Sequence, residues 1–233
     1  MLINSYVFGE VDPYFSNVSL LLHGNGTNGS TSIIDSSQTP QLATAIGNTQ
    51  ISTVQSKFGD TSIATDGTGD YVLLNTNMTI FEFSGDFTIE GFWWFNFNNL
   101  GYQPMLGSAV SADQTGFSLI LESNNTLAFY GATTSIWNTV LLTSTIPTVN
   151  TWHHIAVSRS GSTVRLFLNG TIQGSIGSSN FIRSGSSLRI GGYQYFPGGA
   201  RSLNGFIDEV RITKGISRYT GNFTPPTSAF PNK

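Results

Sequence analysis

The stretch that most limits the folds open to this chain runs over residues 151–170, TWHHIAVSRSGSTVRLFLNG. Residues 153–158 and 163–168 are rich in β-branched and aliphatic side chains, and the polar residues 159–162 between them include a glycine. Two such runs joined by a short polar segment with glycine are typical of a β-hairpin. We therefore predict two antiparallel strands here, with residues 159–162 as the turn.

Side-chain alternation indicates how deeply these strands lie, because successive side chains of a strand point to opposite sides. In the second half of the hairpin, Val164, Leu166 and Leu168 share one wholly apolar face. Residues 86–97, DFTIEGFWWFNF, carry aromatic side chains on both faces, so both faces must be covered. Further short strands are expected at 18–23, 105–107, 116–122, 126–131, 171–176, 187–191 and 205–213. Their spacing, without a competing helical period, predicts an all-β sandwich.

Composition removes several classes of function. The chain has no cysteine, so disulfides, thiolate zinc sites and cysteine nucleophiles are absent. Only 10% of its residues are charged, against about 25% in an average soluble protein. The net charge is −3 and the basic residues are scattered, so a nucleic-acid partner is not expected. The chain shows no apolar run that could span a membrane and no secretory signal, so neither membrane insertion nor export by that route is expected.

No internal repeat or break in composition divides the chain, so one domain with two tails is expected. Residues 1–17 contain a proline and no clear period, and we predict an extended N-terminal arm. Residues 18–214 carry all the predicted strands and form the predicted domain. Residues 215–233 contain three prolines, and we expect a C-terminal segment that wraps around the domain.

Several segments, taken in order, point to a known family. They are LLLHGNGTNGS at 20–30, QSKFGDTSIATDGTGDYV at 55–72, DFTIEGFWWF at 86–95, WHHIAVSRSGSTVRLFLNG at 152–170, LRIGG at 188–192 and FIDEVRITKGISRYTGNFTPP at 206–226. Together they resemble the laminin-G-like jelly-roll domains of the concanavalin A-like lectin and glucanase superfamily. The resemblance covers residues 18–226 and implies an all-β jelly roll, a two-sheet antiparallel sandwich with one concave sheet, to which the N- and C-terminal arms are added.

The two ends of this region narrow the resemblance. DPYFSNVSLLLHG at 12–24 and TKGISRYTGNFTPPT at 213–227 are similar to segments of bacteriophage virion proteins, notably tail-fibre, adhesin and head-surface proteins. In such relatives the loops at one rim of the sandwich bind glycans or protein, often beside a calcium ion. The resemblance implies a binding role, whereas the fold by itself assigns no activity.

The carboxylates are not arranged as in related hydrolases. A retaining glycosidase holds two carboxyl groups about 5 Å apart, which laminarinase-type relatives supply from an E-x-D-x-x-E run, and this chain has no such run. Asp208 and Glu209 are adjacent, so strand alternation predicts that they point to opposite faces. Glu90 lies among aromatic residues, and we expect it to pair with a neighbouring hydroxyl or arginine rather than act as an acid. We therefore predict that the protein is not an enzyme.

Residues that could hold a metal ion are few. His153 and His154 are neighbours on a strand and are expected to face opposite ways, so they do not chelate one ion together. Calcium prefers oxygen ligands, which glycine-rich turns supply. The candidate calcium ligands are Asp66, Asp70, Asn25 and Asp208. Asn25 stands where the virion relatives tend to carry aspartate. The alternative is that Asp66 and Asp70 form Asx turns instead.

Aromatic side chains in polar, glycine-rich loops are the predicted ligand-binding residues. Sugar faces stack on aromatic rings, and binding residues usually lie on loops at the rim of a scaffold. The loop YQYFPGGAR at 193–201 supplies most of them, and two other loops supply one each. The predicted set is Tyr193, Tyr195, Phe196, Arg201, Trp137 and Tyr102. The alternative is that these aromatics cover core edges or pack against another subunit.

These observations predict a non-catalytic bacteriophage virion surface protein, either a capsid decoration protein or a tail-fibre adhesin. Its jelly roll is expected to bind host-surface glycans or other virion proteins, and its expected location is the virion surface. A homo-oligomer such as a trimer would suit both settings. The alternative function is a glycan-active hydrolase or an accessory carbohydrate-binding module.

Overall fold

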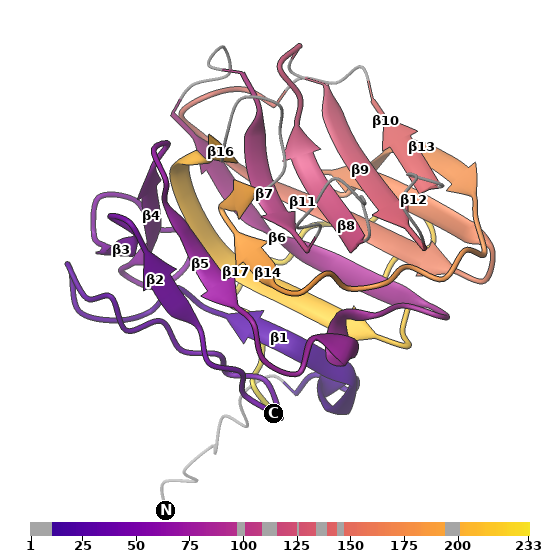
Figure 1. Ribbon diagram of the computed structural model, residues 1–233, viewed down its shortest axis with the longest axis horizontal. Helices are drawn as coiled ribbons and strands as arrows, with labels where there is room; N and C mark the ends of the chain where they lie inside the picture. The colour runs from indigo at the N-terminus through magenta and orange to yellow at the C-terminus, as the bar shows by residue number, and fades with distance from the viewer. Residues whose placement is uncertain are drawn as a thin grey trace, which may run out of the picture.

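Two antiparallel sheets pack face to face in the computed structural model (Figure 1). The structure describes residues 11–96, 101–108, 116–124, 126–133, 139–143, 147–193 and 201–233. The larger sheet runs in the order β13 (Thr171–Gly177), β12 (Thr163–Leu168), β11 (Trp152–Ser160), β6 (Phe87–Phe95), β17 (Asn204–Lys214), β4 (Ser62–Asp66) and β3 (Gln50–Ser52), with β1 (Val18–Leu22) also paired to β17. The all-β prediction and the two-sheet sandwich are therefore confirmed.

The smaller sheet runs in the order β10 (Thr139–Leu142), β9 (Leu127–Ala132), β8 (Gly116–Leu121), β7 (Gln103–Gly107), β14 (Leu188–Ile190), β5 (Tyr71–Leu74) and β2 (Thr44–Ile46). A separate pair joins β15 (Gly192–Tyr193) to β16 (Arg201–Ser202). The described helical elements are two 3-10 turns, η1 (Phe15–Asn17) and η2 (Met78–Phe81). In this part of the chain no helix has the length and apolar character needed to cross a membrane.

The core lies between the sheets, and β6 is buried on both of its own faces, as its aromatic pattern predicted. Trp93 is fully buried in the core between the two sheets. Phe92 points the other way, to the outer face of the larger sheet, where Phe58 and Phe230 pack against it at ring-centroid distances of 5.2 Å and 6.4 Å. β6 is therefore covered on both faces.

The turn of the β11–β12 hairpin is shorter than the sequence predicted. Two residues join the strands, and the first of them, Gly161, has a φ of 57°. Short hairpin loops with positive φ match the right-handed twist of the strands. Arg159, predicted to lie in the turn, is a buried strand residue whose guanidinium donates to the carbonyl oxygens of Gly85 and Asn180 at 2.6 Å each. Its charge is thus satisfied by backbone carbonyls, which the sequence pattern did not reveal.

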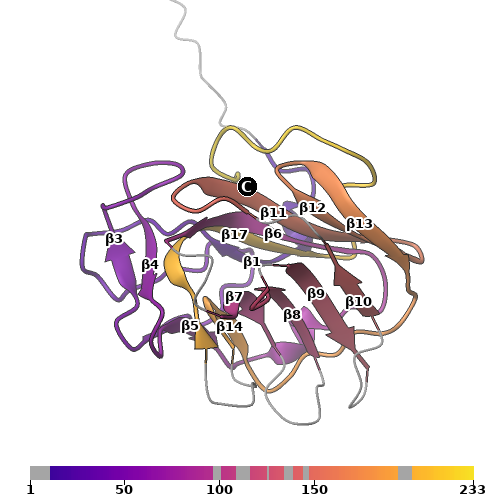
Figure 2. The same ribbon diagram turned by 90° about the horizontal axis from the view of Figure 1, so that it is seen from above.

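The segment after β17 crosses the outer face of the larger sheet (Figure 2). Its Tyr219 and Phe223 rings stack at 3.6 Å, and the Phe223 ring meets Phe167 of β12 edge-on at 5.3 Å. The backbone N–H of Phe223 donates to the carbonyl oxygen of Gly170 at 2.9 Å. At the other end of the segment, the Lys233 carbonyl oxygen accepts a hydrogen bond from the backbone N–H of residue 12 at 2.8 Å. The C-terminal segment is therefore anchored at Tyr219 and Phe223 and again at its last residue.

Two glycines in left-handed conformations test this packing. A Cβ at Gly170, which has a φ of 78°, would collide with the carbonyl oxygen of Phe223, whereas a Cβ at Gly161 would meet no heavy atom within 4 Å. Gly161→Ala should lower the free energy of unfolding by about 1 kcal/mol, the cost of a left-handed non-glycine residue. Gly170→Ala should lower it by at least about 1 kcal/mol more, because the C-terminal segment must shift as well. Urea unfolding measures both, and equal losses would contradict the close approach at Gly170.

Candidate functional site

At the end of β4, two aspartates tie two loops into one rim. Asp70 is fully buried, and its carboxylate accepts hydrogen bonds from the backbone N–H groups of Asn48 at 2.6 Å and Asp66 at 2.7 Å. Asp66 accepts from the side-chain amide of Asn48 at 2.9 Å and from the backbone N–H of Thr68 at 2.8 Å. Gly47 is required beside them, since a Cβ there would collide with the Asp70 carboxylate. The β2–β3 and β4–β5 loops therefore form a single fixed unit.

The two aspartates of this rim differ in how readily they ionise. Burial raises the pKa of the Asp70 carboxyl, and the nearby charge of Asp66 raises it further. The hydrogen bond from the Asn48 side chain lowers the pKa of Asp66, whose residue is exposed. The rim therefore presents the ionised Asp66 carboxylate to solvent, in an orientation fixed by Asn48.

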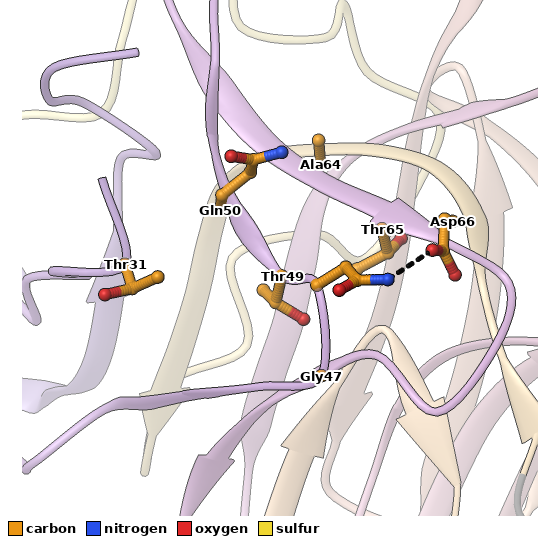
Figure 3. Close-up of a pocket in the computed structure, with 8 residues that line it drawn as sticks. Thr31, Gly47, Thr49, Gln50, Ala64, Thr65 and Asp66 are labelled. Carbon is orange, nitrogen blue, oxygen red and sulfur yellow. Dashed lines mark hydrogen bonds between the residues drawn. The ribbon is translucent and has the colours of Figure 1, made fainter. Parts of the chain in front are cut away.

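An open pocket of about 560 Å³ lies beside this rim (Figure 3). We call it the β3–β4 pocket, and it is lined by Thr31, Gly47, Asn48, Thr49, Gln50, Ala64, Thr65 and Asp66. Its volume lies within the range of about 300–1,000 Å³ typical of small-molecule sites. Most of its lining side chains are hydroxyls, amides and a carboxylate, so it is suited to a ligand rich in hydrogen-bonding groups.

A second, smaller pocket of about 180 Å³ shares Asp66 with the first. We call it the Tyr102–Arg201 pocket, and it is lined by Asp66, Gly67, Thr68, Tyr102, Gln103, Arg201, Ser202 and Asn204. The side-chain amide of Asn204 donates to the Asp66 carbonyl oxygen at 3.0 Å, and its backbone N–H donates to the Gln103 side chain at 2.9 Å. The structure thus brings two predicted ligand-binding residues, Tyr102 and Arg201, next to Asp66.

The other predicted ligand-binding residues are not placed by the structure. Tyr195, Phe196 and Trp137 lie outside the described residues, and Tyr193 ends β15 without a described side chain. Their roles stay predictions.

Sequence reasoning missed the amide side chains of the two pockets, Asn48, Gln50, Gln103 and Asn204. In the sequence these residues are distinguished only by their position at or beside a strand end. Many other Asn and Gln residues of this chain have similar positions, so the pattern could not single these out.

The four candidate calcium ligands lie in three separate places. Asp66 is the last residue of β4, and Asp70 lies in the loop after it. Asn25 lies beside Gly59, which precedes β4 in the chain, and Asp208 lies on the outer face of β17. Both carboxylates at the end of β4 already accept two N–H groups each, one of them in an Asx turn. Within the described ranges no three acidic or histidine side chains are grouped to hold a metal. This geometry does not fit a calcium site, and calcium binding stays a prediction from the resemblance.

Asp208 and Glu209 lie on the same face of β17, so the expectation of opposite faces was wrong. The φ of Glu209 is 52°, and the register with β6 shifts directly after Asp208, which marks a β-bulge. Asp208 accepts a hydrogen bond from the backbone N–H of Phe58 at 3.2 Å, and Glu209 accepts one from the backbone N–H of Phe230 at 2.8 Å. Alternation holds only for a regular strand, and the extra residue of the bulge turns both carboxylates outward.

Glu90 lies on the same outer face and is paired with an arginine, as predicted. One carboxylate oxygen accepts two hydrogen bonds from Arg211, at 2.8 Å and 3.0 Å. The other accepts the Tyr219 hydroxyl at 2.7 Å and lies 3.2 Å from the His154 ring nitrogen Nε2. Burial alone would raise the pKa of Glu90, but Arg211 and His154 outweigh it and hold the pKa at about 2. This carboxylate is therefore an ionised structural group.

The three outer-face carboxylates contact protein rather than open space. Glu90, Asp208 and Glu209 are each at most 1% exposed, because the C-terminal segment and the β3–β4 loop cover them. Glycoside hydrolysis requires carboxyl groups on both sides of a bound glycosidic linkage. Side chains enclosed in this way have no room for a sugar between them.

Comparisons with known proteins agree with this architecture. Residues 66–216 match the model of the concanavalin A-like lectin/glucanases superfamily. The botulinum neurotoxin serotype C1 binding domain has a similar structure, with a TM-score of 0.64 and 13% identity over 94% of this chain and 50% of that one. The binding domain of botulinum neurotoxin DC is also similar, in complex with SialylT (TM-score 0.59, 13% identity, 94% and 49% coverage) and with rat synaptotagmin II (0.61, 14%, 94% and 50%). The chain spans about half the length of these toxin domains, and the comparison with curated proteins found no match.

Asp208 yields a prediction about pH. Burial raises the pKa of its carboxyl to about 7, and the charge of Glu209 adds to the increase. Because this folded-state pKa exceeds the unfolded value, the stability contributed by Asp208 is present at acidic pH and is lost as the pH rises through about 7. Asp208→Asn removes this titration. The stability that the protein loses between about pH 5 and about pH 8 should therefore be smaller in the variant than in the parent, by roughly 1–3 kcal/mol.

Denaturant unfolding of both proteins across this pH range measures the effect. His153 acts in the opposite direction, because burial lowers its pKa and its stability contribution is gained as the pH rises. His153 is present in both proteins, so the difference between them isolates Asp208. The same pH dependence of stability in the variant and the parent would contradict a raised pKa for the buried Asp208 carboxyl.

Proposed function

Because the chain belongs to the concanavalin A-like lectin/glucanase superfamily, we propose that it is a non-catalytic carbohydrate-binding module. The observation that carries the proposal is the polar rim that joins two pockets through Asp66. Neighbouring sugar hydroxyls pair with planar amide and carboxylate groups, which donate and accept in one plane. Asn48, Gln50 and Asp66 supply such groups in one pocket, and the other adds the ring of Tyr102 and the cation of Arg201.

The enclosed carboxylates support a binding role over hydrolysis. Glu90 is ionised and held by Arg211, while Asp208 and Glu209 accept backbone N–H groups of the segments that cover them. None of them lines either pocket of the rim. The carboxylate that does line both pockets, Asp66, is oriented by Asn48 and serves a bound ligand as a hydrogen-bond acceptor.

The similar toxin structures share the architecture of this chain, and several of them are binding domains. One is a binding domain in complex with SialylT, and another is a binding domain in complex with rat synaptotagmin II. For a further similar structure, that of botulinum neurotoxin type C, cell entry depends on interaction with two ganglioside molecules. Those proteins are described with carbohydrate and with protein ligands, and the polar rim of this chain favours carbohydrate.

The setting we propose is the surface of a bacteriophage virion, as a capsid decoration protein or a tail-fibre adhesin that binds host-surface glycans or other virion proteins. This part rests on the resemblance of residues 12–24 and 213–227 to virion proteins. Electron microscopy of source virions with the protein labelled should show label on the head or the tail, and a size measurement on the isolated protein should show an oligomer such as a trimer. Source virions that carry no label would contradict the proposed location on the virion surface.

Carbohydrate binding at the rim is tested by titrating the full chain against a glycan array and measuring the strongest ligand by calorimetry. Gln50→Ala removes an exposed amide of the β3–β4 pocket, and Arg201→Ala removes the cation of the second pocket. Each should weaken binding by about five- to tenfold, the value of one or two hydrogen bonds. Thr171→Ala is the control, since this exposed residue lies on β13 at the opposite edge of the sheet.

Two results would contradict the proposal in different ways. An array without any bound glycan would show that the module does not recognise carbohydrate. Glycan binding that Gln50→Ala and Arg201→Ala leave unchanged would show that the ligand binds away from this rim.

A further inference from the structure

A row of side chains crosses five strands on the outer face of the larger sheet and ends in the β3–β4 pocket. The register places five residues opposite one another in turn: Trp152 on β11, Trp94 on β6, Phe206 on β17, Ala64 on β4 and Gln50 on β3. Directly opposite residues of antiparallel strands project from the same face. The three aromatic side chains therefore continue the floor of the pocket, to which Ala64 and Gln50 belong.

This row is the more exposed of two adjacent rows on that face. Its aromatic residues are half-buried and Gln50 is exposed. In the adjacent row His154, Phe92 and Asp208 are opposite one another and are at most 2% exposed. The C-terminal segment and the β3–β4 loop cover that inner row. Of these two rows, the aromatic one is therefore the more accessible to a ligand.

Amide and carboxylate side chains run parallel to the aromatic row on its open side. They belong to the residues two positions further along the strands, Asn96, Asn204, Asp66 and Asn48. The Asn96 amide donates to the Asn204 side chain at 2.8 Å, and the Asn204 amide donates to the Asp66 carbonyl oxygen at 3.0 Å. The Asn48 amide donates to the Asp66 carboxylate at 2.9 Å. A polar ladder thus flanks an apolar stripe along the same line.

The aromatic row is held in position before any ligand binds. The indole N–H of Trp94 donates to the Asn96 side chain at 3.0 Å, which links this ring to the polar ladder. The Trp94 and Trp152 rings meet edge to face at 5.9 Å. Fixed aromatic groups lose little conformational freedom on binding, which favours affinity.

We propose that this row is an aromatic platform extending the β3–β4 pocket, and that its ligand is a linear, neutral oligosaccharide of several rings. The apolar faces of successive sugars stack on Trp94, Trp152 and Phe206, and their hydroxyl edges bind the polar ladder. Five adjacent strands place the ends of the row roughly 19 Å apart at about 4.8 Å per strand, so one terminal sugar would leave most of it unused. The row itself contains no charged side chain. This inference rests on the proposed carbohydrate-binding function.

The experiment titrates the full chain with linear oligomers of glucose, galactose and N-acetylglucosamine, from monomer to hexamer, by calorimetry. For the sugar that binds, affinity should rise with chain length. Trp94→Ala should weaken hexamer binding by at least about tenfold and monomer binding by less than about twofold, since the monomer occupies the pocket alone. Trp94→Phe should restore most of the hexamer affinity by keeping a ring in place.

Trp152→Ala is a second, independent variant with the same expected loss, and a melting curve establishes that each variant is folded. Tyr14→Ala is the control, because this exposed aromatic residue belongs to the N-terminal segment and not to the row. Equal affinity for monomer and hexamer, with Gln50→Ala still harmful, would overturn the platform and leave the proposed function intact. A preference for acidic over neutral oligomers of equal length would overturn the ligand class. No binding at any length would overturn both proposals.

Discussion

The carboxylate of Glu90 is completely buried near the middle of β6, and it has to be neutralised there because an unpaired buried charge is very costly. Arg211 of β17 and the hydroxyl of Tyr219 supply its partners. Arg211 also forms an ion pair with the Asp12 carboxylate at 3.0 Å, and Arg218 forms a second ion pair with Asp12 at 2.6 Å. One ionic network therefore holds the segments at both ends of the chain against the outer face of the larger sheet. The carboxylates at the centre of that face are buried by the same contacts that stabilise it.

The margin of the larger sheet is the binding surface that we propose. There the strands end in loops fixed by Asp66 and Asp70, and the side chains separate into an aromatic row and a polar ladder. Sugars have the same division, since their ring faces are apolar and their edges carry hydroxyls. The margin therefore has the chemistry and the length that the proposed oligosaccharide requires.

Strand alternation and strand spacing were sufficient to predict the sandwich, because both are local properties, and the apolar face of β12 displays the alternation directly. Arg159 and the Asp208–Glu209 pair were predicted wrongly, since a hairpin register and a bulge depend on the partner strand. Tyr102, Arg201 and Asp66 were identified as candidates, but only the fold brings them into one pocket. The aromatic row combines residues from three distant segments, and no sequence pattern specifies the register that aligns them.

Nuclear magnetic resonance of the labelled protein during titration with the tightest-binding neutral hexasaccharide would test the account most directly. It predicts that chemical shifts change at the indole N–H groups of Trp94 and Trp152 and at the side-chain amides of Asn48 and Asn204. The indole N–H of Trp93, which is fully buried in the core, should stay unchanged. Shift changes confined to the C-terminal segment or to the smaller sheet would contradict the claim that the margin of the larger sheet is the binding surface.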